Sequence, residues 1–114
     1  MLFRDIDLSV SEEVMADIRF VLAYWEVRGQ ARFIEGKSID APTSESAIYQ
    51  IGGQEVNLYF RERLGGDDYV HVVFRDCVEW SDHQFILTLG EDAKMLYEFI
   101  KGGIGFDELV APTT

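Results

Sequence analysis

The strongest structural signal in the sequence is residues 55–80, which read EVNLYFRERLGGDDYVHVVFRDCVEW. Two runs rich in Val, Tyr and Phe, at residues 55–64 and 69–80, flank the turn GGDD at residues 65–68. β-Branched and aromatic residues favour strands, and Gly and Asp favour the tight turn that joins antiparallel neighbours. The stretch therefore predicts a β-hairpin.

The second arm of this hairpin alternates between two faces, because side chains two residues apart lie on the same side of a strand. One predicted face carries Val70, Val72, Phe74, Val78 and Trp80. The other carries Tyr69, His71, Val73, Arg75, Cys77 and Glu79. We therefore expect His71 and Cys77 to share a face.

Upstream of the hairpin, residues 10–28 are predicted to form a helix. Its apolar side chains recur at helical spacing, at Val14, Ile18, Val21, Leu22 and Trp25. Ser9 is the predicted N-cap, with Glu12 completing a capping box, and Ser11 is the alternative cap. Gly29 suits the position just after the helix.

The remaining segments complete an α+β pattern. Residues 2–8 suggest a short strand or an extended lead-in, and the tail at 104–114 is expected to dock or to pair as an edge strand. Further strands are predicted at residues 31–35, 47–51 and 83–89. We predict a single α+β domain over residues 1–114: an N-terminal helix, an antiparallel meander of four to five strands, and a C-terminal helix packed on one sheet face.

The charge balance limits the classes of partner. Twenty-one acidic residues against ten basic ones give a net charge of −11. Nucleic-acid binding needs clustered Lys and Arg, and an anionic membrane surface repels such a chain. We therefore predict no direct nucleic acid and no membrane as partners. A basic protein would be attracted by this field, although acidity for solubility alone is the alternative explanation.

The compartment is predicted from three features. Cys77 is the only cysteine, so no intramolecular disulfide is possible and a reducing compartment suits the chain. Residues 1–10 lack the apolar core of a signal peptide. The longest largely apolar run, residues 18–27, is interrupted by two charges and is too short to cross a bilayer. We expect a cytoplasmic protein.

Signals for catalysis or metal binding are weak. His71 and Cys77 would lie about 20 Å apart along an extended strand, too far to share an ion. Cys77 could meet His83 across the turn between them, but no Gly-rich segment adjoins it to stabilise an oxyanion. No phosphate-binding glycine motif is present. We therefore predict no catalytic residue, no metal site and no cofactor.

The distribution of charge suggests a surface that binds a partner. No Lys or Arg lies between Arg75 and Lys94, whereas carboxylates surround a tryptophan in this segment. Aromatic side chains anchor protein interfaces, and carboxylates pair with Arg or Lys of the partner. The residues predicted to bind a basic partner are Asp76, Glu79, Trp80 and Asp82, joined by Tyr59 and Tyr69. In a nuclease partner these carboxylates would occupy the positions of substrate phosphates.

In size and composition the chain is similar in kind to several classes of small binding protein. These are immunity proteins against nuclease toxins, phage inhibitors of nucleic-acid enzymes, and secretion chaperones. The likeness implies a non-enzymatic protein that inhibits or escorts a basic protein partner.

Two other functions remain open at this level. A pocket between the curved sheet and the N-terminal helix would make the protein a small-ligand binder or a small enzyme. Its predicted polar lining is His71, Arg75 and Tyr69. Alternatively, the protein is a homodimeric subunit of a larger assembly. The surplus apolar surface of the first helix, which would suit this role, consists of Phe20, Tyr24 and Val27.

Overall fold

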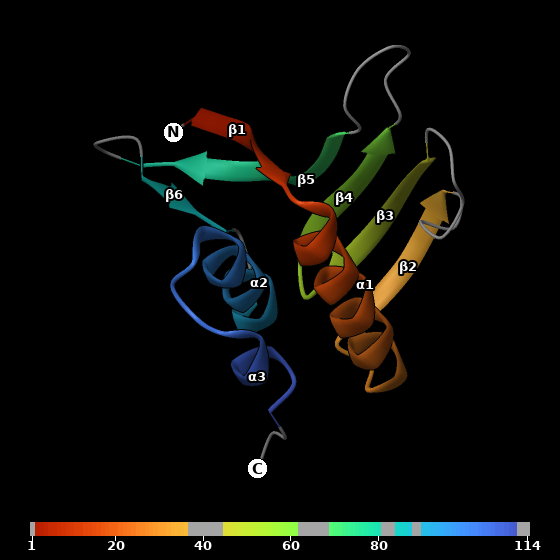
Figure 1. The fold of residues 1–114 in the computed structure, drawn as a ribbon. Coiled ribbons are helices and arrows are strands. Elements are labelled where there is room, and N and C mark those ends of the chain that lie inside the picture. The colour runs from red at the N-terminus through yellow and green to blue at the C-terminus, as the bar shows by residue number, and fades with distance from the viewer. Residues whose placement is uncertain (1, 37–44, 62–68, 81–83, 88–89, 112–114) are drawn as a thin grey trace.

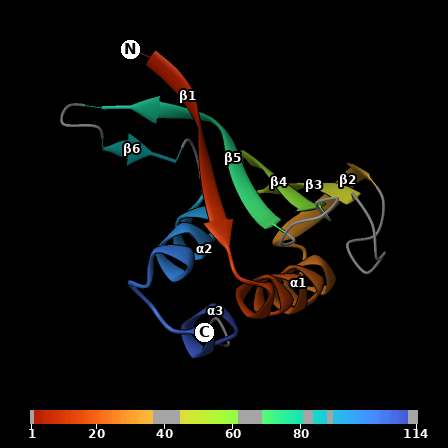
Figure 2. The ribbon, with the colours of Figure 1, turned by 45° about the horizontal axis from the view of Figure 1, so that its top comes forward.

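The computed structural model describes residues 2–36, 45–61, 69–80, 84–87 and 90–111. Its strands are β1 (Leu2–Val10), β2 (Ala31–Gly36), β3 (Glu45–Ile51), β4 (Gln54–Arg61), β5 (Tyr69–Glu79) and β6 (Phe85–Ile86). Its helices are α1 (Glu12–Val27), α2 (Glu91–Lys101) and α3 (Phe106–Leu109). The helices lie on one side of a twisted sheet (Figures 1 and 2).

The described strands form one antiparallel sheet of six strands in the order β1-β5-β4-β3-β2, and β6 pairs with β5. The predicted α+β class with an antiparallel sheet is confirmed. The predicted order of elements is wrong at the N-terminus, where a strand precedes the first helix. The predicted four to five strands become six because the lead-in is a full strand.

β1 owes its place to residues 6–10, where apolar side chains at Ile6, Leu8 and Val10 alternate with polar ones at Asp7 and Ser9. Ile6 lies opposite Phe74, and Leu8 lies opposite Val72 in the antiparallel pairing with β5. Phe74 and Val72 are fully buried, and Ile6 is buried with them. A segment with apolar residues at every second position can bury them all on one face by pairing in a sheet. The lead-in therefore becomes an edge strand of nine residues.

α1 begins two residues later than a cap at Ser9 would place it. Ser11 is the N-cap, and its hydroxyl oxygen accepts the backbone N–H of Val14 at 3.2 Å. Ser9 belongs to β1, where it lies opposite His71. The first choice of cap was therefore wrong and the alternative is confirmed, because strand pairing holds the chain extended as far as Val10.

A bulge in β5 reverses the predicted alternation of its faces. Asp76 has a φ of +53°, and the pairing with β1 shifts register at this point. An extra residue in one strand turns every later side chain to the opposite face. Cys77 therefore joins Phe74 in the core and is fully buried, and the prediction that it shares a face with His71 is wrong.

Gln54 stabilises the point where β5 changes neighbours. β5 pairs with β4 up to Phe74 and with β6 from Val78 onward. Between these two ladders the Gln54 amide donates to the carbonyl of Arg75. A buried carbonyl without a partner would cost stability, so this buried glutamine substitutes for the missing ladder bond.

The helices pack their apolar residues against the sheet in one core. α1 buries Met15, Ile18, Val21, Leu22 and Trp25, and α2 buries Ala93 and Leu96. The Trp25 indole N–H donates to the carbonyl of Leu109 at 3.1 Å, which ties α3 to α1. The described part of the tail thus docks as a short helix and does not pair as a strand. Across the described ranges, none of the helices has the length and apolarity to cross a membrane.

Candidate partner-binding surface

Two ion pairs and one histidine–carboxylate hydrogen bond connect β1 to β5 in the described structure. Arg4 Nε lies 2.8 Å from Glu79 Oε2, and Asp5 Oδ2 lies 3.0 Å from Arg75 Nε. Asp7 Oδ1 lies 2.7 Å from His71 Nδ1. These carboxylates are matched by cations or by an imidazole of the same chain, so they contribute less to attracting a partner than their number suggests.

Asp5 is the centre of this arrangement. Its Oδ1 accepts the backbone N–H of Asp76 at 3.0 Å, so the bulge and the Asp5–Arg75 ion pair share one carboxylate. The Asp5 carboxylate raises the pKa of Arg75 above its ordinary value. Nearby negative charge favours the protonated guanidinium. The ion pair therefore holds the bulge as well as the two strands.

Glu79 lies in a different environment from the one expected for a partner-binding carboxylate. It follows Cys77 by two residues and shares its face of β5, and its side chain is only 10% exposed. Arg4 covers it from the edge strand. Asp76, in contrast, is exposed at the bulge. Of the two, only Asp76 presents its side chain to solvent.

An exposed apolar row crosses three strands at the outer end of the sheet. Phe3 lies opposite Val78, and Val78 lies opposite Ile86. Trp80 extends the row. Its backbone N–H donates to the carbonyl of Gln84, which closes the end of the β5–β6 ladder. Phe3 and Trp80 are each 61% exposed and Ile86 is 50% exposed. We call Phe3, Val78, Trp80 and Ile86 the apolar row.

The structure separates the predicted partner-binding residues into two groups. Trp80 belongs to the apolar row and Asp76 precedes its Val78 by two residues, whereas Tyr59 lies opposite His71 on β4. Trp80 follows His71 by nine positions, which correspond to about 30 Å of extended chain, so Tyr59 and Trp80 do not form one surface. Asp82 lies outside the described residues. Tyr69 belongs to β5, but its side chain is outside what the structure describes.

His71 and Arg75, the predicted pocket residues, face away from α1. They alternate with Val72 and Phe74, which point into the core beneath the helices. His71 pairs with Asp7 and Arg75 with Asp5 on the opposite face of the sheet. They therefore do not line a space between the sheet and α1.

Cys77 has the environment of a structural thiol. Burial raises its pKa to about 11, and the charges of Asp5 and Asp76 act in the same direction. A thiol with this pKa is protonated at neutral pH and is a poor nucleophile. Within the described ranges, no three His, Cys, Asp or Glu side chains are grouped so that they could hold a metal ion.

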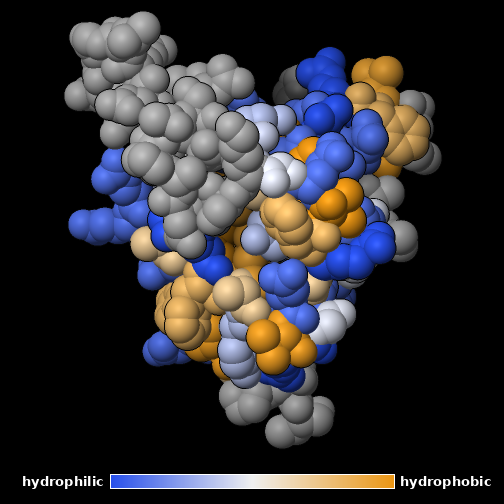
Figure 3. Space-filling view, turned by 90° about the vertical axis from the view of Figure 1, so that its right-hand side faces the viewer, coloured by the Kyte–Doolittle hydropathy of each residue, from blue (hydrophilic) through white to orange (hydrophobic). Residues whose placement is uncertain are grey.

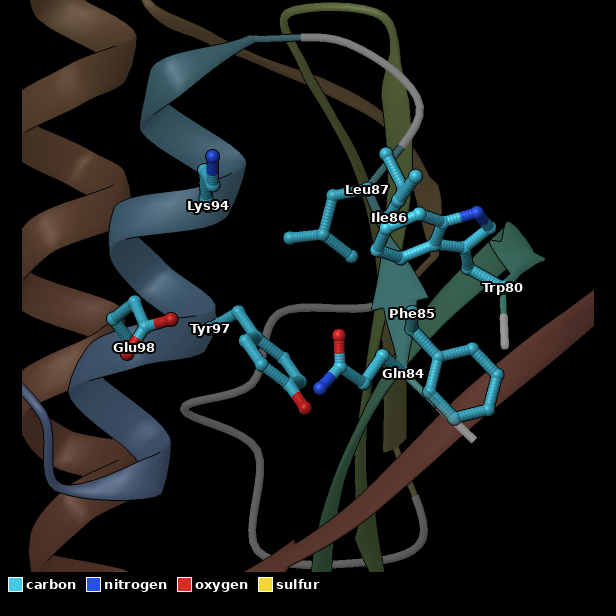
Figure 4. A pocket seen from close by; sticks show the side chains of 8 residues that line it. All are labelled: Trp80, Gln84, Phe85, Ile86, Leu87, Lys94, Tyr97 and Glu98. Carbon is cyan, nitrogen blue, oxygen red and sulfur yellow. The ribbon is translucent and has the colours of Figure 1, made fainter. Parts of the chain in front are cut away.

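A small pocket opens beside the apolar row, between β6 and α2 (Figure 4). Its volume is about 240 Å³. It is lined by Trp80, Gln84, Phe85, Ile86, Leu87, Lys94, Tyr97 and Glu98. This pocket could not be predicted from the sequence, because its walls come from the end of β5, from β6 with its flanking residues, and from α2. The residue that could have indicated the pocket is Tyr97 of α2, an aromatic side chain that carries a polar group.

Apolar side chains are also exposed elsewhere. Phe20 and Val27 lie on α1, and Phe33 and Ile34 lie on β2. Viewed from the side that carries β2, the hydrophobic surface is divided by hydrophilic residues (Figure 3). The apolar row differs from these patches in that two of its own residues, Trp80 and Ile86, line a pocket; the cavity beside β2 is lined by Ala31 and Arg32 and not by Phe33 or Ile34.

Comparisons of the chain with protein-family models, with curated proteins and with solved structures found no match.

Proposed function

We propose that the chain is a non-enzymatic binding protein that inhibits or escorts a basic protein partner. The observation that carries the proposal is the apolar row, where Phe3, Trp80 and Ile86 leave at least half of each side chain exposed at one end of the sheet. Exposed apolar patches of this kind are typical of protein-binding surfaces. Tryptophan is one of the side chains that are enriched at the energetic centres of protein interfaces.

The net charge of −11 supports a basic partner. Arg4 and Arg75 neutralise the carboxylates of Glu79 and Asp5, so we ascribe the attraction to the net charge of the whole molecule. Long-range attraction raises the rate of encounter, while buried apolar contacts hold the complex together. The single cysteine suits a partner met in a reducing compartment such as the cytoplasm.

A pull-down from native lysate at low salt, followed by elution with high salt and mass spectrometry, tests this proposal. The expected result is one strongly basic protein that is released by salt. The Ile86→Ser and Trp80→Ala variants should each reduce its capture, because they shorten the apolar row. Val27→Ser is the matched control, since Val27 is 90% exposed on α1, away from the row.

Equal capture by the wild type and by both row variants would contradict the proposed surface. Loss of capture in the Val27→Ser control alone would move the binding surface to α1. Recovery of only acidic proteins, or of nothing, would contradict the basic partner.

A further inference from the structure

We propose that the pocket between β6 and α2 receives an arginine side chain of the partner. This inference rests on the proposed function, because it names the group by which a basic protein would be recognised. The pocket adjoins the apolar row, since Trp80 and Ile86 belong to both. An arginine that enters it would therefore lie at the edge of the same contact surface.

The size of the pocket favours a single side chain. Its volume of about 240 Å³ is below the range of roughly 300–1,000 Å³ that is usual for sites of small-molecule ligands. One long side chain fits such a space, and the rest of its protein remains outside.

The lining favours an occupant with an apolar stem and a polar head. Five of the eight lining residues are aromatic or aliphatic: Trp80, Phe85, Ile86, Leu87 and Tyr97. Figure 4 shows Leu87, Gln84 and Tyr97 on the side of β6 that faces α2, and the Trp80 indole beyond Leu87. A side chain that passes between these groups would bury its methylene groups against them.

The polar lining can accept hydrogen bonds from a guanidinium group. In the described structure, neither the Tyr97 hydroxyl nor the Gln84 amide has a hydrogen-bond partner of its own. Burial raises the pKa of Tyr97, and the Glu98 carboxylate adds to this effect, so the phenol stays protonated at neutral pH. A wholly apolar occupant would cover these groups without satisfying them, which costs binding energy.

Two oppositely charged residues line the pocket one helical turn apart, so the sign of the occupant's charge can be tested by removing either of them. Glu98 would attract a guanidinium, and Lys94 would repel it. An indole favours arginine over lysine, because a planar guanidinium can stack on its face. A carboxylate in the pocket would instead be repelled by Glu98 and attracted by Lys94, and the net negative charge of the molecule would repel it as well.

The experiment is an NMR titration of the ¹⁵N-labelled protein with N-acetyl-arginine amide, and with the leucine and glutamate analogues. We expect the arginine compound to shift the Trp80 indole N–H and the amides of Leu87 and Tyr97, and the other two compounds to leave them in place. Trp80→Ala should abolish these shifts, and its side chain is exposed enough for the change not to open the core. Glu98→Gln should lower the affinity for the arginine compound by roughly two- to fivefold, and Lys94→Gln should raise this affinity by a similar factor.

Shifts of the same size with the leucine compound would overturn the inference in favour of an apolar anchor. No shift up to the solubility limit of the arginine compound would overturn it outright, as would a stronger effect of the glutamate compound. The titration uses no natural partner, so its failure is distinct from failure of the pull-down. A basic protein captured through the apolar row would still support the proposed function if the pocket stayed empty.

Discussion

Asp76 determines which side chains of β5 face the core and which belong to the apolar row. Its φ of +53° lies in the left-handed region, which side chains other than glycine rarely adopt. Asp tolerates this region better than most residues. The resulting bulge sends Cys77 into the core and turns Val78 toward Phe3 and Ile86. Without the bulge, Val78 would face the helices and the apolar row would not exist.

Substitutions at Asp76 test this role of the backbone. Asp76→Val should lower the free energy of unfolding by about 1–2 kcal/mol, because a β-branched residue is strained at positive φ. Asp76→Gly should cost much less, since glycine adopts this conformation without strain. Urea denaturation of both variants measures the difference, with Asp76→Asn as the control that removes only the charge. Equal losses of unfolding free energy in Asp76→Val and Asp76→Gly would show that the Asp76 side chain, and not its backbone conformation, stabilises the protein.

At the scale of elements, the junction between β1 and α1 contains two serines, Ser9 and Ser11, that could each serve as the N-cap of α1. A serine just before an apolar helical stripe suits an N-cap, and both Ser9 and Ser11 satisfy this rule. Pairing between β1 and β5 decides between them, because it continues to Val10 opposite Val70. The local signal therefore indicates the presence of a cap, while its position follows from the partner strand.

The pair of serines provides its own matched control. Ser11→Ala should lower the free energy of unfolding by about 1 kcal/mol, because the N–H of Val14 loses its acceptor. Ser9→Ala should change it by less than about 0.5 kcal/mol, as expected for an exposed strand position. Thermal or urea unfolding of the two variants gives the comparison. A larger loss for Ser9→Ala would mean that the helix begins earlier than the structure shows.

At the scale of the whole molecule, the ion pairs and the net charge act in opposite directions. The ion pairs between β1 and β5 stabilise the edge strand and are weakened by salt. The protein carries a net charge of −11, so its negative charges repel one another, and salt screens this repulsion. Exposed ion pairs are each worth little, so the self-repulsion should be the larger effect.

The melting temperature should therefore rise with added NaCl, from low ionic strength to about 0.15 M, where the Debye length is about 8 Å. Differential scanning calorimetry at several salt concentrations, with the buffer and pH held constant, measures this dependence. A melting temperature that falls over this range would show that the ion pairs outweigh the net repulsion.

The sequence by itself determined the α+β class, the helix over most of its length and the position of the central strands. These features depend on local periodicity: apolar residues every three to four positions in α1 and every second position in the strands. Part of β1 has the same periodicity, but a short segment at the edge of a sheet forms a strand only when a neighbouring strand, here β5, pairs with it. The net charge of −11, on which the proposal of a basic partner rests, also comes from the sequence alone.

Only the tertiary structure decided which side chains reach the surface together. The bulge at Asp76 reverses the faces of β5, and no local pattern marks it, because Asp is common in ordinary turns as well. The apolar row joins residues from β1, β5 and β6, and the pocket adds residues from α2. Such groupings depend on register between distant segments, which is set by the packing of the core as a whole.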